Sequence, residues 1–407
     1  MPNHPGDAPR PLPERPNLRH LKDQAKDLLR SGGAESITHA QLQIARLYGF
    51  PSWPKLKAHI DLLNDTGQLK HAIDTNDFEQ VKHLMIRSPE LHRAPLGYGK
   101  NGPLTWVAEC RIPWGPPAPE RLAMARWMIE NGSDIHQGGD GPLMRAALNS
   151  DRIAMMELLV SRGANVNAEW NGNFPIILAP CESVSPGALE WLLAHGADPN
   201  CRNSKSSNTA LDYLIGTYAR STNLARCIEL LVGAGGTTRY DLPGVLDILR
   251  GRLDILSARI DADPSLLQRR FPELDCGSTG ARRLLLQGAT LLHLAAEFGN
   301  EEAIALLLDR GADVNVRAAV DDGGVGGQTA IFHAVTQFPG RGLAVTRLLL
   351  ERGADLSIRV KLPGHYERPD EFVECTPLGY ALRFPGSEFP DANEATIRLL
   401  REHGAQE

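Results

Sequence analysis

The chain has 407 residues, of which 42% are hydrophobic and 23% are charged. This composition is ordinary for a folded protein, and a formal net charge of −6 gives no reason to expect tight binding to a polyanion. No run of about 18 apolar residues occurs, which argues against a membrane-spanning helix. The six cysteines are far apart and form no CxxC pair, so we expect free thiols in a cytoplasmic protein rather than a zinc ribbon or a disulfide framework.

The N-terminal part differs from the rest of the chain. Residues 1–16 contain six prolines and almost nothing to bury, so we expect a disordered arm. The leader that follows, residues 17–64, carries three predicted helices. The first lies within 17–33 and has leucines on one face, and the other two lie within 36–63, separated by a tight turn at Gly49.

We expect the leader to cap the structure that follows it, because the end of a stacked array must cover its apolar face. The side chains expected to be buried against the first following unit are Leu42, Ile44, Leu47, Phe50 and Trp53. Two helices around a Gly turn also resemble a DNA-binding helix-turn-helix. Residues 1–60 hold nine basic and five acidic side chains, a weaker basic excess than a DNA reader usually shows, and nucleic acid is not an expected partner.

Self-similarity organises residues 65–407. Five predicted helices end on a Leu pair followed by a glycine, which can close a helix in the left-handed conformation. These glycines are Gly163, Gly196, Gly311, Gly353 and Gly404. A second short helix is predicted before each, opening at "GPLMRAA" (141–147), "FPIILA" (174–179), "TLLHLAA" (290–296), "TAIFHA" (329–334) and "TPLGYA" (376–381). We expect Ala146, Ala179, Ala295 and Ala381 to be buried where paired helices touch.

These residues resemble the ankyrin repeat, which has a T-P-L-H-x-A pattern and a period near 33 residues. The clearest copy is "GATLLHLAAEFGNEEAIALLLDRGADVN", from Gly288 to Asn315. The resemblance implies an all-α solenoid of about nine helix-turn-helix units with long finger loops, preceded by the small helical cap. Regular repeats are expected at about 102–238 and 288–407, and degenerate units at about 67–97 and 241–272. The leader is similar to a segment that precedes the repeats of many bacterial ankyrin proteins.

Extra residues between repeats mark where function is expected, because loops can vary without disturbing the stacked helices. The step from Ala330 to Pro377 is 47 residues, about 14 longer than the repeat norm. We therefore expect residues 362–374 to form a protruding finger beside that of residues 317–328. In an ankyrin fold such fingers lie beside the concave groove. The glycines of "GGVGGQ" (323–328) follow two acids and lack the Lys of a phosphate loop.

The candidate binding residues lie mainly in these fingers. They are Asp321, Asp322, His365, Tyr366, Glu367, Asp370, Glu371, Trp114 and Trp170. The acids predict a locally acidic ridge that suits a basic partner surface, with Tyr366 as its apolar contact and Glu374 nearby. As a catalytic alternative, Glu371, Asp322 and His365 are the candidates. No recognised metal-ligand spacing occurs and no cofactor is expected. His293 and His333 are expected to hydrogen-bond adjoining loops.

The sequence therefore favours a non-enzymatic scaffold that binds another macromolecule, with a protein preferred, through its concave face and finger loops. The alternative is an enzyme or small-molecule binder whose pocket is built by the long C-terminal fingers. An open groove would favour the scaffold hypothesis. A deep pocket with convergent polar groups from two repeats would favour the enzyme or small-molecule binder.

Overall fold

A computed structural model describes most of the chain. The described residues are 10–13, 16–63, 65–96, 101–112, 114–216, 220–240, 242–274, 284, 286–336, 342–364, 370–383 and 393–407, with the backbone alone at 61–63. Most of the predicted N-terminal arm lies outside them. The chain forms two compact units, described separately here. Unit 1 comprises Met1–Ala146 with Asp151–Asn171, and unit 2 comprises Ala147–Ser150 with Gly172–Glu407.

The leader consists of three helices, as the sequence predicts: α1 (Leu18–Arg30), α2 (Ile37–Leu47) and α3 (Trp53–Leu63). The side chain of Asn17 caps α1 by accepting from the Arg19 amide at 2.8 Å. Ser36 caps α2 in the same way, accepting from the His39 amide at 3.1 Å. Gly49 has a φ of +81°, which confirms the tight turn between α2 and α3.

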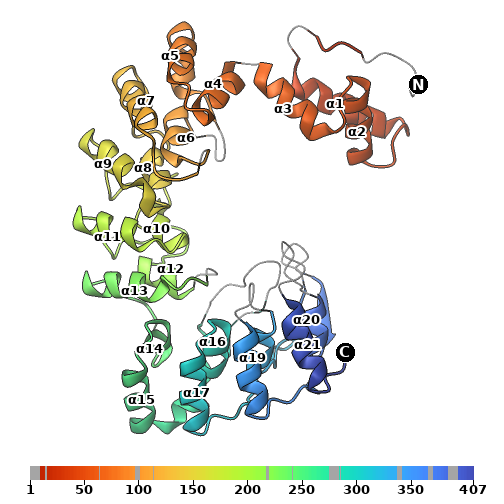
Figure 1. The fold of residues 1–407 in the computed structure, drawn as a ribbon, viewed down its shortest axis with the longest axis vertical. Coiled ribbons are helices and arrows are strands. Elements are labelled where there is room, and N and C mark those ends of the chain that lie inside the picture. The colour runs from red at the N-terminus through yellow and green to blue at the C-terminus, as the bar shows by residue number, and fades with distance from the viewer. Residues whose placement is uncertain are drawn as a thin grey trace. The chain divides into compact units, whose positions relative to one another are not determined.

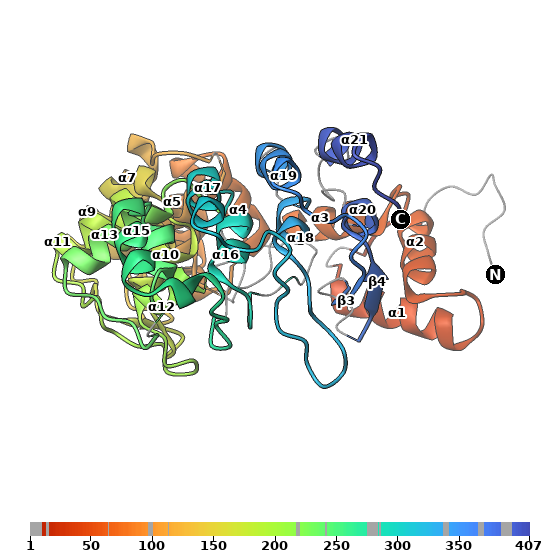
Figure 2. The same ribbon diagram turned by 90° about the horizontal axis from the view of Figure 1, so that it is seen from below.

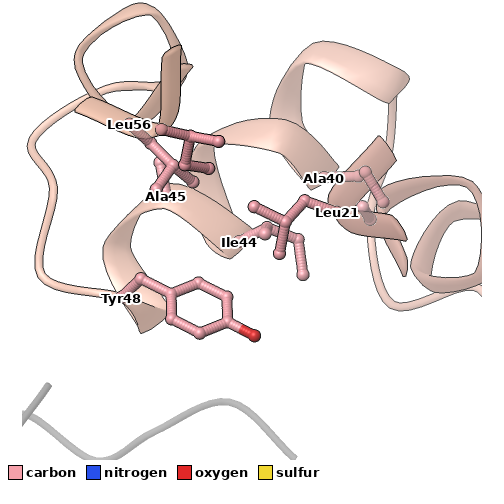
Figure 3. Packing of buried hydrophobic residues seen from close by; sticks show 9 residues of the cluster. Leu21, Ala40, Ile44, Ala45, Tyr48 and Leu56 are labelled. Atoms are coloured by element: carbon pink, nitrogen blue, oxygen red, sulfur yellow. The ribbon is translucent and has the colours of Figure 1, made fainter. Parts of the chain in front are cut away.

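The leader has a hydrophobic core of its own. Figure 3 shows Leu21 of α1 beside Ala40 and Ile44 of α2, with Tyr48 and Leu56 close by. Leu47, Phe50 and Trp53, predicted to lie against the first repeat, are half-buried and pack against this core. These side chains therefore pack within the leader itself. The capping role of the leader remains a prediction.

The rest of the described chain is mostly helical, with successive helices packed in pairs (Figure 1). In unit 1 the elements are α4 (Asp65–Asp74), α5 (Phe78–Arg87), α6 (Pro103–Glu109), α7 (Pro119–Glu130), α8 (Gly141–Ala146), α9 (Ile153–Ser161) and β1 (Glu169–Trp170). In unit 2 they are β2 (Phe174–Pro175), α10 (Leu178–Glu182), α11 (Pro186–Ala194), α12 (Ala210–Ile215), α13 (Leu224–Gly233), α14 (Val245–Leu249), α15 (Leu253–Ala262), α16 (Leu291–Glu297), α17 (Glu301–Asp309), α18 (Ala330–Ala334), α19 (Gly342–Glu351), β3 (Val360–Pro363), β4 (Phe372–Cys375), α20 (Pro377–Arg383) and α21 (Glu394–Glu402).

The predicted glycine stops are confirmed. Each of the five glycines follows the end of a helix and has a positive φ, between the +79° of Gly404 and the +104° of Gly163. A side chain is strained in this conformation, which accounts for glycine at each position. The number of repeats stays a prediction.

The two degenerate segments share one architecture. Each is a helix pair followed by a short 3₁₀ helix that begins at a proline, Pro89 in one and Pro264 in the other. One predicted helix start is wrong. Residues Phe174–Pro175 are extended as β2, and α10 begins only at Leu178, because Pro175 ends a short strand rather than occupying the first helical turn.

Small side chains bring the paired helices together. Ala146, Ala179, Ala295 and Ala381 are all 0% exposed, as the sequence predicts. In α16, Ala295 is followed by the fully buried Ala296, and the helix packs against both α17 and α18. Interiors packed at this density have no space for added methylene groups.

Ala295→Leu is therefore expected to overpack α16 and to lower the free energy of unfolding by about 1–3 kcal/mol. The matched control is Ala258→Leu, since Ala258 is exposed on α15. Thermal melts of the two variants and the wild type check this. A melting temperature for Ala295→Leu equal to that of the wild type would show that the contact is not tight.

Candidate functional site

The predicted second finger contains two paired strands, and we call its described residues, 360–364 and 370–375, finger 2. Strand β3 pairs antiparallel with β4, with Val360 opposite Cys375 and Pro363 opposite Phe372. Beyond the strands, the Gly364 amide donates to the Glu371 carbonyl at 2.8 Å. Cys375 is 4% exposed and α20 begins at Pro377, so the predicted end of this insertion is confirmed.

The preceding loop, which we call finger 1 (residues 317–328), is shaped by Asp321. Its carboxylate accepts from the amides of Gly323 at 2.9 Å and Val325 at 2.8 Å. Gly326 has a φ of +113°, and a Cβ there would lie 2.3 Å from the Ala319 carbonyl oxygen. The glycines of this loop therefore serve a tight turn, and Asp321 holds that turn together.

The two fingers lie side by side, as their spacing in the sequence predicts (Figure 2). The Gly326 amide donates to the Lys361 carbonyl at 2.9 Å, which attaches finger 1 to the outer edge of β3. The Lys361 ammonium in turn donates to the Gly323 carbonyl at 3.2 Å. Both fingers extend from the same side of the helix pairs that carry them.

A row of arginines fixes the bases of the fingers, and sequence reasoning missed it. Arg270 donates to the carbonyl of Arg317 at 2.9 and 3.1 Å, and Arg317 donates to the carbonyl of Arg359 at 3.0 Å. Arg359 continues the row to the main-chain oxygen of Glu407 at 3.0 Å. Arg270 and Arg317 thus each hold the start of a finger, at Arg317 and at Arg359. The available signal for this row was an arginine at the same place in two repeats, in "NVR" (315–317) and "SIR" (357–359).

Two hollows adjoin finger 1. The first, which we call the apolar groove, has a volume of about 490 Å³. Its lining is Pro272, Leu284, Gln287, Gly288, Ala319, Val320, Asp321, Val325, Gly326, Gln328, Leu362, Pro363 and Phe372. Two of these apolar side chains are widely exposed, Val320 at 58% and Phe372 at 49%.

The second hollow, which we call the basic cavity, has a volume of about 550 Å³. Its charged lining comprises Arg317, Arg359 and Lys361 together with Glu374, and glycines of finger 1 supply much of the remainder. The finger surface is therefore not acidic throughout, in contrast to the ridge expected from the sequence. Polar groups from two repeats do meet in this cavity.

The predicted acids have different surroundings. Asp321, Asp322 and Asp370 are all exposed, and Asp321 in addition accepts the hydrogen bonds that hold the turn of finger 1. Glu371 is exposed and lies 3.9 Å from the Arg383 guanidinium. His365, Tyr366 and Glu367 lie outside the described residues.

The two tryptophan candidates belong to unit 1, on different repeats from the fingers. Trp114 is 65% exposed and lies over the guanidinium of Arg152 at 4.6 Å. Trp170 is half-buried, with its indole nitrogen 3.4 Å from the Asn101 side-chain oxygen. Packing fits Trp170, but Trp114 contributes little to the interior.

A buried polar network lies behind the fingers. His293 is fully buried; its Nε2 donates to the Gln328 carbonyl at 2.9 Å, and its Nδ1 accepts from Thr290. This confirms the predicted bond to an adjoining loop. His333 instead contacts the buried carboxylate of Glu297 at 2.7 Å, and Arg220 pairs with the same carboxylate at 2.9 Å. The network thus joins three repeats.

The remaining properties of the described residues concern metal binding, membrane spanning and free thiols. They contain no group of three His, Cys, Asp or Glu side chains arranged to hold a metal ion. Within the same residues, no helix combines the length and the apolar character needed to cross a bilayer. Cys110, Cys181, Cys201, Cys227 and Cys375 are free thiols, and all but Cys201 are buried.

Comparison with known proteins supports the resemblance to ankyrin repeats. Residues 118–203 and 258–360 match the family described as ankyrin repeats. A B-cell lymphoma 3 protein homolog of Mus musculus is 34% identical over 139 residues, covering 34% of this chain and 28% of the relative. A probable E3 ubiquitin-protein ligase XBOS33 of Oryza sativa subsp. japonica is 38% identical over 111 residues, covering 26% and 19%. A dynein axonemal heavy chain 12 of Bos taurus is 24% identical over 242 residues, covering 51% and 63%.

The chain spans less than two thirds of the length of each of these relatives. All three come from eukaryotes, so the expected bacterial type stays a prediction.

Loss of the Asp321 carboxylate is expected to open the turn of finger 1. Asp321→Ala removes the acceptor of two amides, so the Val325 amide should exchange its hydrogen about ten times faster, equivalent to ~1.4 kcal/mol. Asp322→Ala is the matched control, because Asp322 is the exposed neighbour. Hydrogen exchange resolved at single residues checks both. Equal rates at Val325 in the two variants would contradict the assignment.

His293 is expected to make stability depend on pH. Burial, helped by the nearby His333, lowers the pKa of His293 to about 3. Since its unfolded pKa is about 6.5, the stabilising form is the neutral one. This stability is complete above pH ~6.5 and is lost as the pH falls toward 3, by about 1.4 kcal/mol per pH unit.

Denaturant unfolding of the wild type and His293→Gln, at pH 7 and at pH 5, measures this dependence. The glutamine can still donate to the Gln328 carbonyl but does not titrate. The wild type should therefore lose more stability than the variant between the two pH values, and equal losses would contradict the role given to His293.

Proposed function

Since residues 118–203 and 258–360 match ankyrin repeats, we propose that this chain is a non-enzymatic scaffold whose C-terminal fingers bind another protein. Ankyrin repeats are in general protein-interaction modules. The proposal places the contact on fingers 1 and 2 and on the adjoining concave face of the repeats. A cytoplasmic location and a capping role for residues 17–64 belong to the same proposal.

The observation that carries the proposal is the apolar groove with its two exposed side chains. Val320 and Phe372 are 58% and 49% exposed, and both line the groove. Apolar surface of this kind gains free energy when a partner covers it, at about 25 cal/mol for each Å² removed from water. Aromatic side chains are also enriched among the residues that carry most of the binding energy at interfaces.

The order of the fingers supports the same function. Hydrogen bonds from Gly326, Lys361 and Arg317 join finger 1 to finger 2. Loops already held in one arrangement lose little conformational entropy when a partner binds. The fingers thus present a prepared surface.

The alternative of an enzyme or small-molecule binder rests on the basic cavity, where polar groups from two repeats meet. Catalysis by two carboxylates needs a pair that faces a common substrate with separated pKa values. Among the described candidates, the Asp321 carboxylate accepts a hydrogen bond within the turn of finger 1, and the Glu371 carboxylate lies 3.9 Å from the Arg383 guanidinium. These contacts favour a binding surface over an acid–base pair.

The test is photocrosslinking from the groove. Phe372 is replaced by a photoreactive phenylalanine analogue, which keeps an aromatic ring at this position, and the variant is irradiated in lysate of the source organism. The control carries the analogue at Ile86, which is 68% exposed on α5. We expect a discrete crosslinked protein from position 372 that is absent from position 86. Its loss in a Val320→Ser background would confirm that the groove makes the contact.

The same crosslinked species from both positions would contradict the proposal, and so would no crosslinked protein at position 372. Circular dichroism of each variant establishes that the fold is retained.

A further inference from the structure

The arginines of this protein have two kinds of partner. Three on or next to the second helices of the repeats pair with acids of the preceding repeat: Arg162 with Glu130, Arg226 with Glu190, and Arg352 with Asp309, at 2.7 to 3.0 Å. The pairs recur along the chain, so positive charge on that surface is balanced locally.

The cations of the fingers are not balanced in this way. Arg317 donates to the carbonyls of Gly327 and Arg359, Arg359 to the main-chain oxygen of Glu407, and Lys361 to the carbonyl of Gly323. Within the described residues, none of the three lies within ion-pair distance of a side-chain carboxylate. The carbonyls that hold Arg317 and Lys361 fix the positions of these two cations but leave their charge in place.

All three cations line the basic cavity, and the only acid in its lining is Glu374. Glu374 lies opposite Lys361 in the register of the hairpin and offsets one of the three charges. Asp321 is absent from the lining of this cavity and lies on the adjoining apolar groove, where its carboxylate accepts from two amides of its own turn. The lining of the basic cavity therefore carries an excess of positive charge, beside the glycines of finger 1.

The basic cavity and the apolar groove share a boundary. Val320 and Gly326 of finger 1 line both hollows. A chain segment lying across finger 1 therefore meets an apolar surface on one side and three cations on the other. An acidic segment with an apolar side chain at its centre matches both surfaces at once.

Resting on the protein-binding function proposed above, we propose that the segment bound by the fingers is an acidic peptide stretch of the partner. An apolar side chain of the stretch occupies the groove beside Phe372, and its flanking carboxylates enter the basic cavity. Charge complementarity of this kind raises the association rate and selects against basic partners. The same attraction weakens as salt screens it.

The test uses a fluorescein-labelled peptide with a central phenylalanine flanked by three glutamates on each side. Fluorescence anisotropy measures its binding to the full chain at low and at high salt. We expect saturable binding that weakens with salt, and none for the same peptide with lysines in place of the glutamates. Lys361→Gln should weaken binding about five-fold, and Lys361→Arg should retain it.

The matched control is Lys205→Gln, because Lys205 is an exposed lysine in another loop of the same unit and lies outside both hollows. It should bind the peptide as the wild type does. The proposal is overturned if the glutamate peptide does not bind, if Lys361→Gln and Lys205→Gln are equal, or if free citrate competes as well as the unlabelled peptide. The last outcome would assign the cavity to a small anion.

These failures are separable from failure of the proposed function. If crosslinking at position 372 succeeds and the peptide does not bind, the partner exists but is not acidic at this site. If crosslinking also fails, the function proposed for the fingers is wrong as well.

Discussion

Paired helices of the repeats pack in close contact through small buried side chains. Ala295 and Ala296 are fully buried at such a contact, and side chains of that size leave no room between helices. Any residues added between repeats must therefore lie outside the stack. The long connections before α18 and α20 do so, and they become fingers 1 and 2. The packing of the helices thus determines where variable surface arises.

A protruding loop is useful for recognition only if it is ordered, and the fingers are ordered by main-chain hydrogen bonds. The Gly326 amide and the Lys361 carbonyl join the fingers at their middle, and the Arg317 guanidinium joins them at their bases by donating to the Arg359 carbonyl. These bonds use backbone acceptors, so they consume no acids. Order and positive charge consequently occur together in these residues, which supports the proposed preference for an acidic segment.

The sequence predicted the parts of the fold that depend on local signals. The five glycine stops, the buried alanines and the end of finger 2 at Cys375 follow from a repeated pattern and from spacing. The start of α10 was missed, because Phe174–Pro175 fits both a helix opening and a short strand. In the leader, the half-burial of Phe50 and Trp53 against its own helices could not be separated from burial against a repeat.

The candidate site was predicted less well, because it depends on contacts over long distances in the sequence. The sequence predicted that the site lies on two adjacent fingers. It also predicted an acidic surface, because only the acids of the fingers were taken into account. The row of arginines requires bonds across 47 and 42 residues, and the pairing of Arg220 with Glu297 spans 77. The available local clues were the recurrence of an arginine at positions 317 and 359, and Asp321 shortly before two glycines, since Asp often caps a turn.

The central claim is that the partner covers the two fingers. The most direct measurement is hydrogen exchange of the full chain, alone and with the purified partner identified by crosslinking. With the partner bound, we expect slower exchange in residues 319–327 and 360–364 than in the chain alone, with no change in the helices of the leader. Protection confined to the leader or to the α5–α9 helices, with the fingers unchanged, would contradict it.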